Sequence, residues 1–393
     1  MTDEPTTGDE PGARDELVSV NDHIIEPPDV WQGHLPPRFY AGAPRVIDLP
    51  DSDGQAWLVE DRVYPIPSIA TVAGQDKSTF RDPKPARFEW MRPGCYDPVA
   101  RVQDMDRDGV TMQTCFPSFP KQAGTVFFRM KDRETALACI RAYNDFVLEE
   151  WCASAPERFV PLAIVPLWDV EEAAREASRT LEAGARGVSF LEDPAKEGLP
   201  SYHSRYWDPL LSVIEQADAA LCLHFFSSPT RWTPAEDSPW ATDLTLMYCT
   251  SMAAMVGLLF SPVLSTFPRL KVLLAEGGIG WLPFMLEKAD FFWDRHGSYA
   301  LGPSAGAPSR PSELFRGRIY GAFISHDTSG LRERAAIGIN QITWQCDYPH
   351  ADSTWPESRA LLGDMLRDLD PPEQAAIMSK NARRLFGIDR YGV

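Results

Sequence analysis

The stretch LKVLLAEGGIGWLPFMLE, residues 270–287, contains an apolar run followed by an amphipathic segment. The run Leu270–Ala275 has the length and composition of a buried β-strand, and the segment from Trp281 onward has the spacing of an amphipathic helix. A strand followed by a helix is the repeating unit of parallel α/β folds, in which each helix returns the chain to the start of the next strand.

The same unit recurs along most of the chain. The apolar runs are Leu17–Val20, Val110–Phe116, Phe159–Leu167, Ala185–Leu191, Ala220–Phe225, Leu270–Ala275, Ile319–Ile324 and Ile342–Cys346. The amphipathic segments between them include Glu134–Ala153, Val170–Glu182, Trp207–Ala217, Leu244–Phe260 and Trp281–Trp293. Eight parallel strands are the number that closes a TIM-type barrel. The sequence therefore predicts an α/β protein with a (β/α)8 barrel, with an open doubly wound sheet as the alternative.

The interval between the first and second runs is much longer than the others. A Pro-rich segment, residues 36–97, fills most of it. In a barrel this insertion either covers the C-terminal mouth as a lid or packs on the outer helices as a surface excursion. We expect a disordered acidic tail at residues 1–16, a single barrel domain at residues 17–387 and a C-terminal tail at residues 388–393.

Composition narrows the function class. The 393 residues include 38 Lys and Arg against 56 Asp and Glu, a net charge of −18, which argues against nucleic-acid and anionic-membrane partners. Seven scattered cysteines without a C-x-x-C pair are typical of reduced, buried thiols in a cytoplasmic enzyme. The acidic N-terminus has no signal-peptide core, and the apolar stretch 252–264 is too short to span a membrane. We therefore expect a cytoplasmic location.

Polar residues follow most of the predicted strands, at the end of a barrel where active sites form. They are Asn21, Asp22, His23 and Glu26 after the first strand, Glu192 and Asp193 after the fourth, His224 on the fifth, Glu276 on the sixth, His326 and Asp327 after the seventh, and Asp347 and His350 after the eighth. Four of the seven histidines of the chain are in this set. Clustered carboxylates are costly without a cation, and imidazole and carboxylate are metal ligands, so the pattern predicts a metal site.

Motifs for other chemistries are missing from the sequence. There is no phosphate-binding G-x-x-x-x-G-K-[ST] loop and no G-x-S-x-G elbow, and AEGGIG lacks the spacing of a dinucleotide fingerprint. The run DMDRDG at residues 104–109 lacks the twelfth-position glutamate of a calcium loop, and its glycine is better explained as the end of a helix.

The motifs VNDHIIEPPDVW, LHFFSS, LLAEGGIGWLPFMLE and DYPHADSTWP resemble the amidohydrolase-2 family, the aminocarboxymuconate-semialdehyde-decarboxylase-like branch of the amidohydrolase superfamily. The resemblance extends from Leu17 to about Gly387 and implies a distorted barrel with a metal at its mouth. The metal-ligand positions of the family fall on Asn21, His23, His224 and Asp347. Asparagine is a weaker, neutral ligand at a position where aspartate is usual.

Glu192 and Glu276 lie at strand ends where superfamily members place further ligands, and Asn21 or Glu26 completes the set. Two histidines with several carboxylates suit a pair of iron ions, as in di-iron carboxylate proteins. The sequence is also similar to amidohydrolase-fold nonheme diiron monooxygenases that hydroxylate terpenoid acids as coenzyme A thioesters. Our first hypothesis is such an oxidoreductase with two Fe ions.

Two other hypotheses stay open. One is a decarboxylase or hydrolase of a carboxylated substrate with a single Zn or Mn, and the other is a binding protein on an inactivated barrel. For an enzyme, we expect catalytic roles for His326, His350 and Glu26, because hydrogen-bonded groups next to a metal orient its ligands or transfer protons. We also expect a homo-oligomer, a dimer.

An acidic protein needs local positive charge to bind an acidic or acyl-thioester substrate. Two basic segments offer it: Arg81, Lys84, Arg87 and Arg92 in the insertion, and Lys121, Arg129, Lys131 and Arg133 after the second strand. The alternative is that the arginines and lysines of the two segments are scattered charges that face the solvent.

Overall fold

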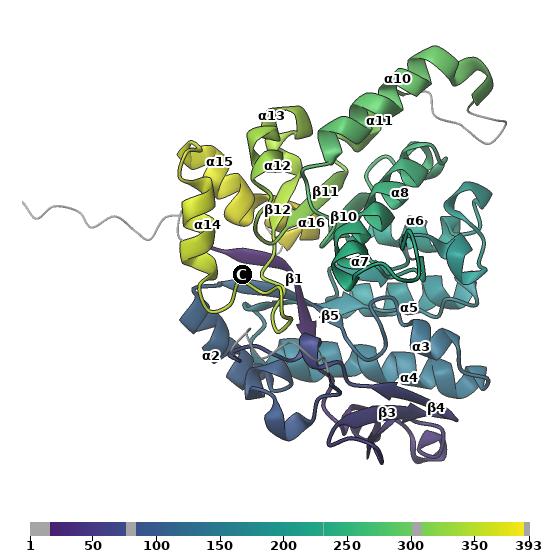
Figure 1. Ribbon diagram of the computed structural model, residues 1–393. Helices are drawn as coiled ribbons and strands as arrows, with labels where there is room; N and C mark the ends of the chain where they lie inside the picture. Colours follow the sequence, from purple (N-terminus) through teal and green to yellow (C-terminus); the bar gives the residue numbers. More distant parts are fainter. Residues whose placement is uncertain (1–15, 76–83, 231, 301–308, 389–393) are drawn as a thin grey trace, which may run out of the picture.

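Eight parallel strand positions form the centre of the computed structural model, which describes residues 16–75, 84–230, 232–300 and 309–388 (Figure 1). The strands are β1 (Val18–Ile24), β5 (Met112–Pro117), β6 (Phe159–Val160) with β7 (Leu162–Ala163), β8 (Gly187–Phe190), β9 (Ala220–His224), β10 (Lys271–Ala275), β11 (Ile319–Phe323) and β12 (Ile342–Trp344). Each overlaps one of the predicted apolar runs, although β1 continues beyond its run to Ile24 and β5 ends one residue later than predicted, at Pro117. All neighbouring pairs among them are parallel.

The strands form two hydrogen-bonded sheets, β1-β5-β6 and β12-β11-β10-β9-β8-β7. The third strand is divided into β6 and β7 at Pro161, which has no N–H to continue the ladder. The first and last strands are joined just beyond β12, where Asp347 N donates to Asn21 O at 3.0 Å and His23 N donates to Tyr348 O at 2.7 Å. The predicted barrel is therefore confirmed, and its two sheets are connected at both junctions.

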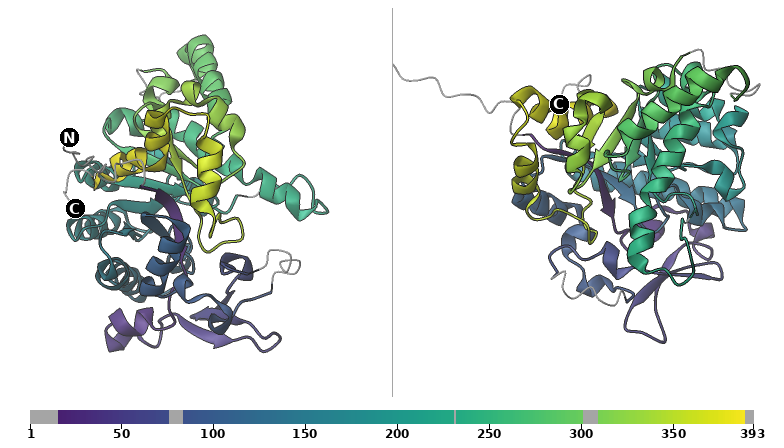
Figure 2. Two further views of the ribbon diagram at one scale, coloured as in Figure 1. Left: turned by 90° about the vertical axis from the view of Figure 1, so that its left-hand side faces the viewer. Right: turned by 45° about the horizontal axis from the view of Figure 1, so that its top comes forward.

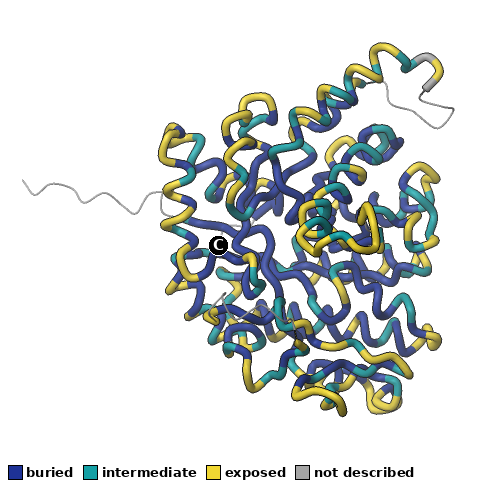
Figure 3. The backbone as a smooth tube through the Cα atoms, viewed as in Figure 1, coloured by how far each residue is buried: buried dark blue, intermediate teal, exposed yellow. Residues whose placement is uncertain are grey.

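Helices surround the strands, and the strands form the buried centre (Figures 2 and 3). The helices are α1 (Val30–His34), α2 (Pro98–Asp108), α3 (Thr125–Phe128), α4 (Arg133–Asp145), α5 (Val170–Glu182), α6 (Asp208–Gln216), α7 (Trp240–Leu246), α8 (Tyr248–Leu259), α9 (Val263–Thr266), α10 (Leu282–Ala300), α11 (Pro311–Phe315), α12 (Thr328–Arg332), α13 (Arg334–Ile337), α14 (Ser358–Leu366), α15 (Pro371–Ala375) and α16 (Asn381–Phe386). Helix α5 has the predicted bounds, and the Asp169 side chain caps it by accepting from two backbone N–H groups.

The insertion between β1 and β5 contains a small antiparallel sheet of β2 (Arg45–Asp48), β3 (Gln55–Val59) and β4 (Arg62–Pro65). Trp57, Tyr64 and Ile66 from this region line a large cavity at the C-terminal ends of the barrel strands. The insertion therefore contributes to the cavity wall. Its predicted action as a lid stays a prediction, as do the domain limits, and residues 1–15 and 389–393 of the two tails lie outside the described residues.

Within the described ranges, one helical stretch, Trp240–Leu259, is long and apolar enough by composition to cross a membrane. One such stretch is weak evidence for a membrane span, since core helices pass the same test. In the fold it consists of α7 and α8, which are separated at Met247, and α8 buries Met255 and Leu258 in the core.

Candidate active site

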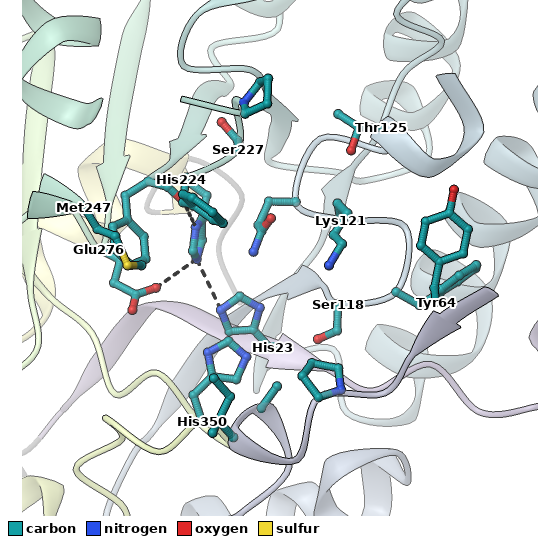
Figure 4. A pocket seen from close by; sticks show the side chains of 18 of the residues that line it. His23, Tyr64, Ser118, Lys121, Thr125, His224, Ser227, Met247, Glu276 and His350 are labelled. Atoms are coloured by element: carbon teal, nitrogen blue, oxygen red, sulfur yellow. Dashed lines mark hydrogen bonds and ion pairs between the residues drawn. The ribbon is translucent and has the colours of Figure 1, made fainter. Parts of the chain in front are cut away.

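Five predicted residues meet at the mouth of the barrel, namely His23, His224, Glu276, Asp347 and His350. Figure 4 labels all of them except Asp347. His23 Nε2 lies 3.3 Å from Asp347 Oδ1 and 3.2 Å from His224 Nε2. His224 Nε2 also lies 3.1 Å from Glu276 Oε2, and His350 Nδ1 lies 3.1 Å from Asp347 Oδ1. One potential ligand atom from each of His23, Glu276, Asp347 and His350 lies within 4.8 Å of the others. This spacing is suited to a metal ion.

An irregularity in β1 aims His23 at this cluster. Val18 and Val20 pack in the core cluster that contains Cys222 and Tyr320 from other barrel strands. Strict alternation would continue this face with residue 22, but the β1–β5 register shifts between Ser19 and Asp22. His23 then lines the cavity instead. The bulge therefore changes which side chains of β1 face the site.

Glu276 and Asp347 both have left-handed backbone conformations, with φ of 59° and 62°. Glu276 directly follows β10, and Asp347 lies three residues beyond Trp344, the last residue of β12. Non-glycine residues adopt this conformation at a free-energy cost of roughly 1 kcal/mol or more, so it persists where surrounding structure enforces it. Here the sharp turns bring both carboxylates over the end of the barrel.

The unpaired polar atoms of the cluster fit a bound cation. Oε2 of Glu276 and both carboxylate oxygens of Asp347 are buried without a hydrogen bond, and so are both amide atoms of Asn21, two residues before His23 on β1. Burial, with the nearby Asp347 as the second cause, raises the pKa of Glu276 to about 7. Burial lowers the pKa of His23. A divalent ion would satisfy the unpartnered oxygens of Glu276 and Asp347 and balance the clustered carboxylates, and His23 would ligate it through Nε2, the nitrogen that faces Asp347 and His224.

The tautomer of His224 follows from its neighbours. Its Nδ1 lies 2.7 Å from the carbonyl oxygen of Phe225, which can only accept a hydrogen bond. The proton of a neutral ring is therefore on Nδ1, and the lone pair of Nε2 is directed toward His23 and Glu276. This is the arrangement that prepares a histidine to ligate a metal.

A buried arginine, Arg101 on α2, supports the cluster. No sequence pattern marks it, because it lies among other charged residues of the same helix. Its guanidinium donates to His23 O at 2.6 Å, Gly94 O at 2.6 Å and Gln113 Oε1 at 3.2 Å. Asp22, also buried, accepts from Gln113 Nε2 at 3.2 Å and from Tyr348 N at 3.0 Å. This network connects β1 to the segment after β12.

The structure does not bring all predicted site residues into the cluster. Glu192 is buried, but its Oε1 accepts from Ser251 Oγ at 2.7 Å and it is not one of the four clustered ligands. His326 is exposed and does not line the cavity. Glu26 does line the cavity, where its carboxylate accepts from the backbone N–H groups of Ser118 and Phe119. Burial raises the pKa of Glu26 to about 7.

The cavity has a volume of about 710 Å³, and its walls are largely apolar and aromatic, with Trp57, Phe119 and Trp240 among them. Of the two basic segments, only the second reaches this cavity within the described residues, through Lys121 and Arg129. Arg129 forms an ion pair with Glu197 at 2.6 Å.

The other described arginines and lysines of the two segments contact other groups. Lys131 pairs with Asp61, Arg87 pairs with Asp48, Arg92 pairs with Asp104, and Arg133 donates to Phe128 O. Arg81 lies outside the described residues, and Lys84 does not line the cavity. The first segment is therefore not a cavity-lining patch in the described structure.

The family model described as amidohydrolase matches residues 31–388. This chain belongs to the amidohydrolase family. Among curated relatives, the 2-amino-3-carboxymuconate-6-semialdehyde decarboxylase of Dictyostelium discoideum is 23% identical over 77% of this chain and 80% of its own length. The gamma-resorcylate decarboxylase of Rhizobium radiobacter is 27% identical over 66% of this chain and 79% of its own.

Solved structures share the fold of this amidohydrolase-family chain. An amidohydrolase from Mycobacterium avium subsp. paratuberculosis K-10 superposes with a TM-score of 0.73 at 21% identity, covering 95% of this chain and 99% of the other. A manganese-bound dihydroxybenzoic acid decarboxylase from Polaromonas sp. JS666 has a TM-score of 0.61 at 18% identity, covering 95% of this chain and 98% of the other.

These comparisons correct our first functional hypothesis. The relatives are decarboxylases, so the expected nonheme diiron monooxygenase, and with it the oxidoreductase class, is wrong. The expected pair of Fe ions is not supported either. The structural reason is Glu192, for which the strand-end position predicts a further metal ligand but which hydrogen-bonds to Ser251 and is not one of the four clustered side chains. Within the described residues, one group of four side chains could hold one ion.

Proposed function

We propose that this protein is a metal-dependent decarboxylase of a small aromatic or unsaturated carboxylic acid. The observation that carries the proposal is the His23–Glu276–Asp347–His350 cluster at the base of an apolar cavity. The decarboxylase relatives support it, since they act on carboxylates by name. Our earlier alternative, a decarboxylase or hydrolase of a carboxylated substrate, is thereby narrowed.

His23, Glu276 and Asp347 of this cluster would hold a single Mn²⁺ or Zn²⁺ ion together with His224, whose Nε2 lies 3.1 Å from Glu276 Oε2, since imidazole and carboxylate donors suit both metals. His350, the fourth member of the cluster, is then left for proton transfer. When bound, the ion would supply positive charge that orients the carboxylate end of the substrate and stabilises negative charge formed in the transition state. Asn21 is a neighbour of this set that adds no charge to it. Glu192 is not one of the proposed ligands.

The side chains of the cavity perform the remaining tasks. The aromatic walls exclude water, which favours loss of CO2 because a charged carboxylate becomes a neutral product. The C–C bond to the carboxyl carbon breaks, its electron pair stays on the substrate carbon, and that carbon needs a proton. His350 lines the cavity and contacts Asp347 through Nδ1, which leaves Nε2 as the nitrogen that delivers this proton.

The experiment is metal analysis followed by a substrate screen. We expect about one Mn²⁺ or Zn²⁺ per chain after reconstitution, and stoichiometric CO2 release from a benzoate-type or enoate acid. Removal of the metal by a chelator should abolish the release. Hydrolysis of an ester or amide without release of CO2 from any acid would contradict the proposal.

His350→Gln separates two roles of that histidine. As a proton donor, His350 is dispensable for the metal, so the variant should keep its metal content and lose CO2 release by about 100-fold or more. Loss of the metal from His350→Gln would instead make it a ligand. The cytoplasmic location, the dimer and the lid action of the insertion remain further proposals for this protein.

A further inference from the structure

We propose that Lys121 forms a second anion-binding subsite in the cavity, which selects substrates that carry an acidic group in addition to the carboxylate that is lost. The inference rests on the proposed function for the orientation of the substrate. It adds a specificity-determining residue and a narrower substrate class, namely acids with two separated anionic groups.

The first observation is the position of Lys121. It follows β5 in a turn in which Lys121 N donates to Ser118 O at 3.2 Å, and its side chain lines the same cavity as His23 and His224 (Figure 4). Lys121 has a φ of 61°, a left-handed conformation that is costly for a residue with a Cβ atom. The turn thus holds a strained backbone that directs a long cationic side chain into the cavity.

The second observation is that this cation is unpaired. Across the described part of the chain, the ammonium group of Lys121 makes no hydrogen bond or ion pair. The nearby carboxylate of Glu26 is already held by two backbone N–H groups. The other described cavity cation among lysines and arginines, Arg129, is bound by both oxygens of Glu197 at 2.6 and 2.9 Å.

The third observation concerns the same turn. The hydroxyl oxygen of Ser118 is buried and has no hydrogen-bond partner among the described residues, although buried hydroxyl groups normally have one. Ser118 and Lys121 border the cavity together, so they offer a hydroxyl donor and an ammonium donor to one ligand group. An anion is the ligand that both donors favour.

The size and charge of the cavity fit a ligand with two acidic ends. A volume of about 710 Å³ lies in the range of sites for drug-sized ligands and exceeds the need of one small ring. With a net charge of −18, the protein repels anions in general, so each anionic group of a substrate needs a local cation. The metal cluster meets this need at one place in the cavity, and Lys121 meets it at another.

The test is direct binding to the Mn²⁺-reconstituted protein by isothermal titration calorimetry. The probes are three diacids with increasing separation (isophthalate, 4-carboxycinnamate and biphenyl-4,4′-dicarboxylate), each compared with the monoacid of the same skeleton. At least one diacid should bind about tenfold or more tightly than its monoacid, because it gains a charge-assisted contact. Lys121→Met should abolish that preference, and Lys121→Arg should retain part of it.

Lys131→Met is the matched control. It removes the same charge from the same region of the chain, but Lys131 pairs with Asp61 outside the cavity, so the diacid preference should be unchanged. Ser118→Ala should reduce the preference by a smaller factor than Lys121→Met. A wild-type protein that prefers no diacid, or a Lys121→Met variant that keeps the full preference, would overturn the subsite.

Binding is read without turnover, so the two proposals can fail separately. A diacid preference that depends on Lys121, in a protein that releases CO2 from none of the acids, supports the subsite and contradicts the decarboxylase. Release of CO2 with no effect of Lys121 on the diacid preference gives the opposite result.

Discussion

The guanidinium of Arg101 donates a 2.6 Å hydrogen bond to the carbonyl oxygen of His23, so a buried cation on α2 holds the backbone of a proposed metal ligand on β1. Arg101 also lies over the ring of Tyr348, the residue after Asp347. Arg101 therefore contacts both segments that carry ligands here, β1 at His23 and the segment after β12 at Tyr348. Its charge is balanced in part by the buried Asp22.

Replacing Arg101 should weaken both the fold and the metal site. Arg101→Met leaves the carbonyl oxygens of His23 and Gly94 without their donor and Asp22 without its cation, which should cost about 3–5 kcal/mol of unfolding free energy. Urea unfolding of the metal-free protein measures this. Arg101→Lys, which keeps the charge, should fold. It should bind the metal more weakly than wild type does. Arg107→Met, an exposed change on the same helix, should cost less than about 1 kcal/mol.

Two buried glutamates provide a test of the ligand assignment. Glu276→Gln should lower metal affinity by at least about tenfold, because Glu276 Oε2 lies with His224 in the cluster. Glu192→Gln should leave metal affinity nearly unchanged, since its carboxylate is directed to Ser251. Metal titration by calorimetry compares the two variants. Equal losses in both would restore Glu192 to the ligand set.

Asn21→Asp should raise metal affinity, because it adds a negative charge beside the proposed cation. The same change should lower the thermal midpoint of the metal-free protein, since an uncompensated buried carboxylate is costly. Thermal unfolding with and without Mn²⁺ should therefore show a larger metal-induced increase in Tm for Asn21→Asp than for wild type. An equal increase in Tm in both proteins would place Asn21 outside the reach of the ion.

The titration of Glu26 predicts a pH dependence of stability. Its pKa is raised in the folded protein to about 7 from 4.5, so the folded state binds the proton more tightly. Its contribution to stability is present below the unfolded pKa and is lost as the pH rises through about 7, with a total on the order of 3 kcal/mol. Glu26→Gln cannot titrate. The Tm of Glu26→Gln minus the Tm of wild type should therefore become larger as the pH is raised from 5 to 8.

The control for this pH experiment is Glu171→Gln, an exposed change in the first turn of α5. Its Tm should follow that of wild type across the same pH range. If the difference in Tm between Glu26→Gln and wild type were constant with pH, Glu26 would not titrate in this range.

The strands were predictable because each buried parallel strand is a short apolar run, and the ends of these runs located His23, His224, Glu276 and Asp347. Position at a strand end does not fix the direction of a side chain. Glu192 satisfies the same rule but contacts Ser251, and His326 lies in a left-handed turn with its side chain exposed.

Other features depend on contacts that sequence spacing does not reveal. The burial of Arg101 results from packing between α2 and the segment after β12, residues far apart in the chain. The unpaired state of Lys121 depends on Glu26 and Glu197 being bound elsewhere. Counting residue types alone also assigned Glu192 to the ligands, although its carboxylate contacts Ser251, and this favoured the unsupported pair of irons and the incorrect hypothesis of an oxygenase.

The hydrogen bond from Tyr348 N to Asp22 Oδ1 joins residues 326 positions apart. A ribosome must therefore have released nearly the whole chain before the first strand can meet the last one. During synthesis His23 is present long before Asp347 and His350. Metal binding is therefore expected at the final stage of folding rather than at its start. A chain that stalls or is cleaved before β12 can fold part of its strands and helices, but it lacks Asp347, one of the four proposed ligands, and His350, the proposed proton donor. Metal retention during purification would thus report that synthesis and barrel closure were completed.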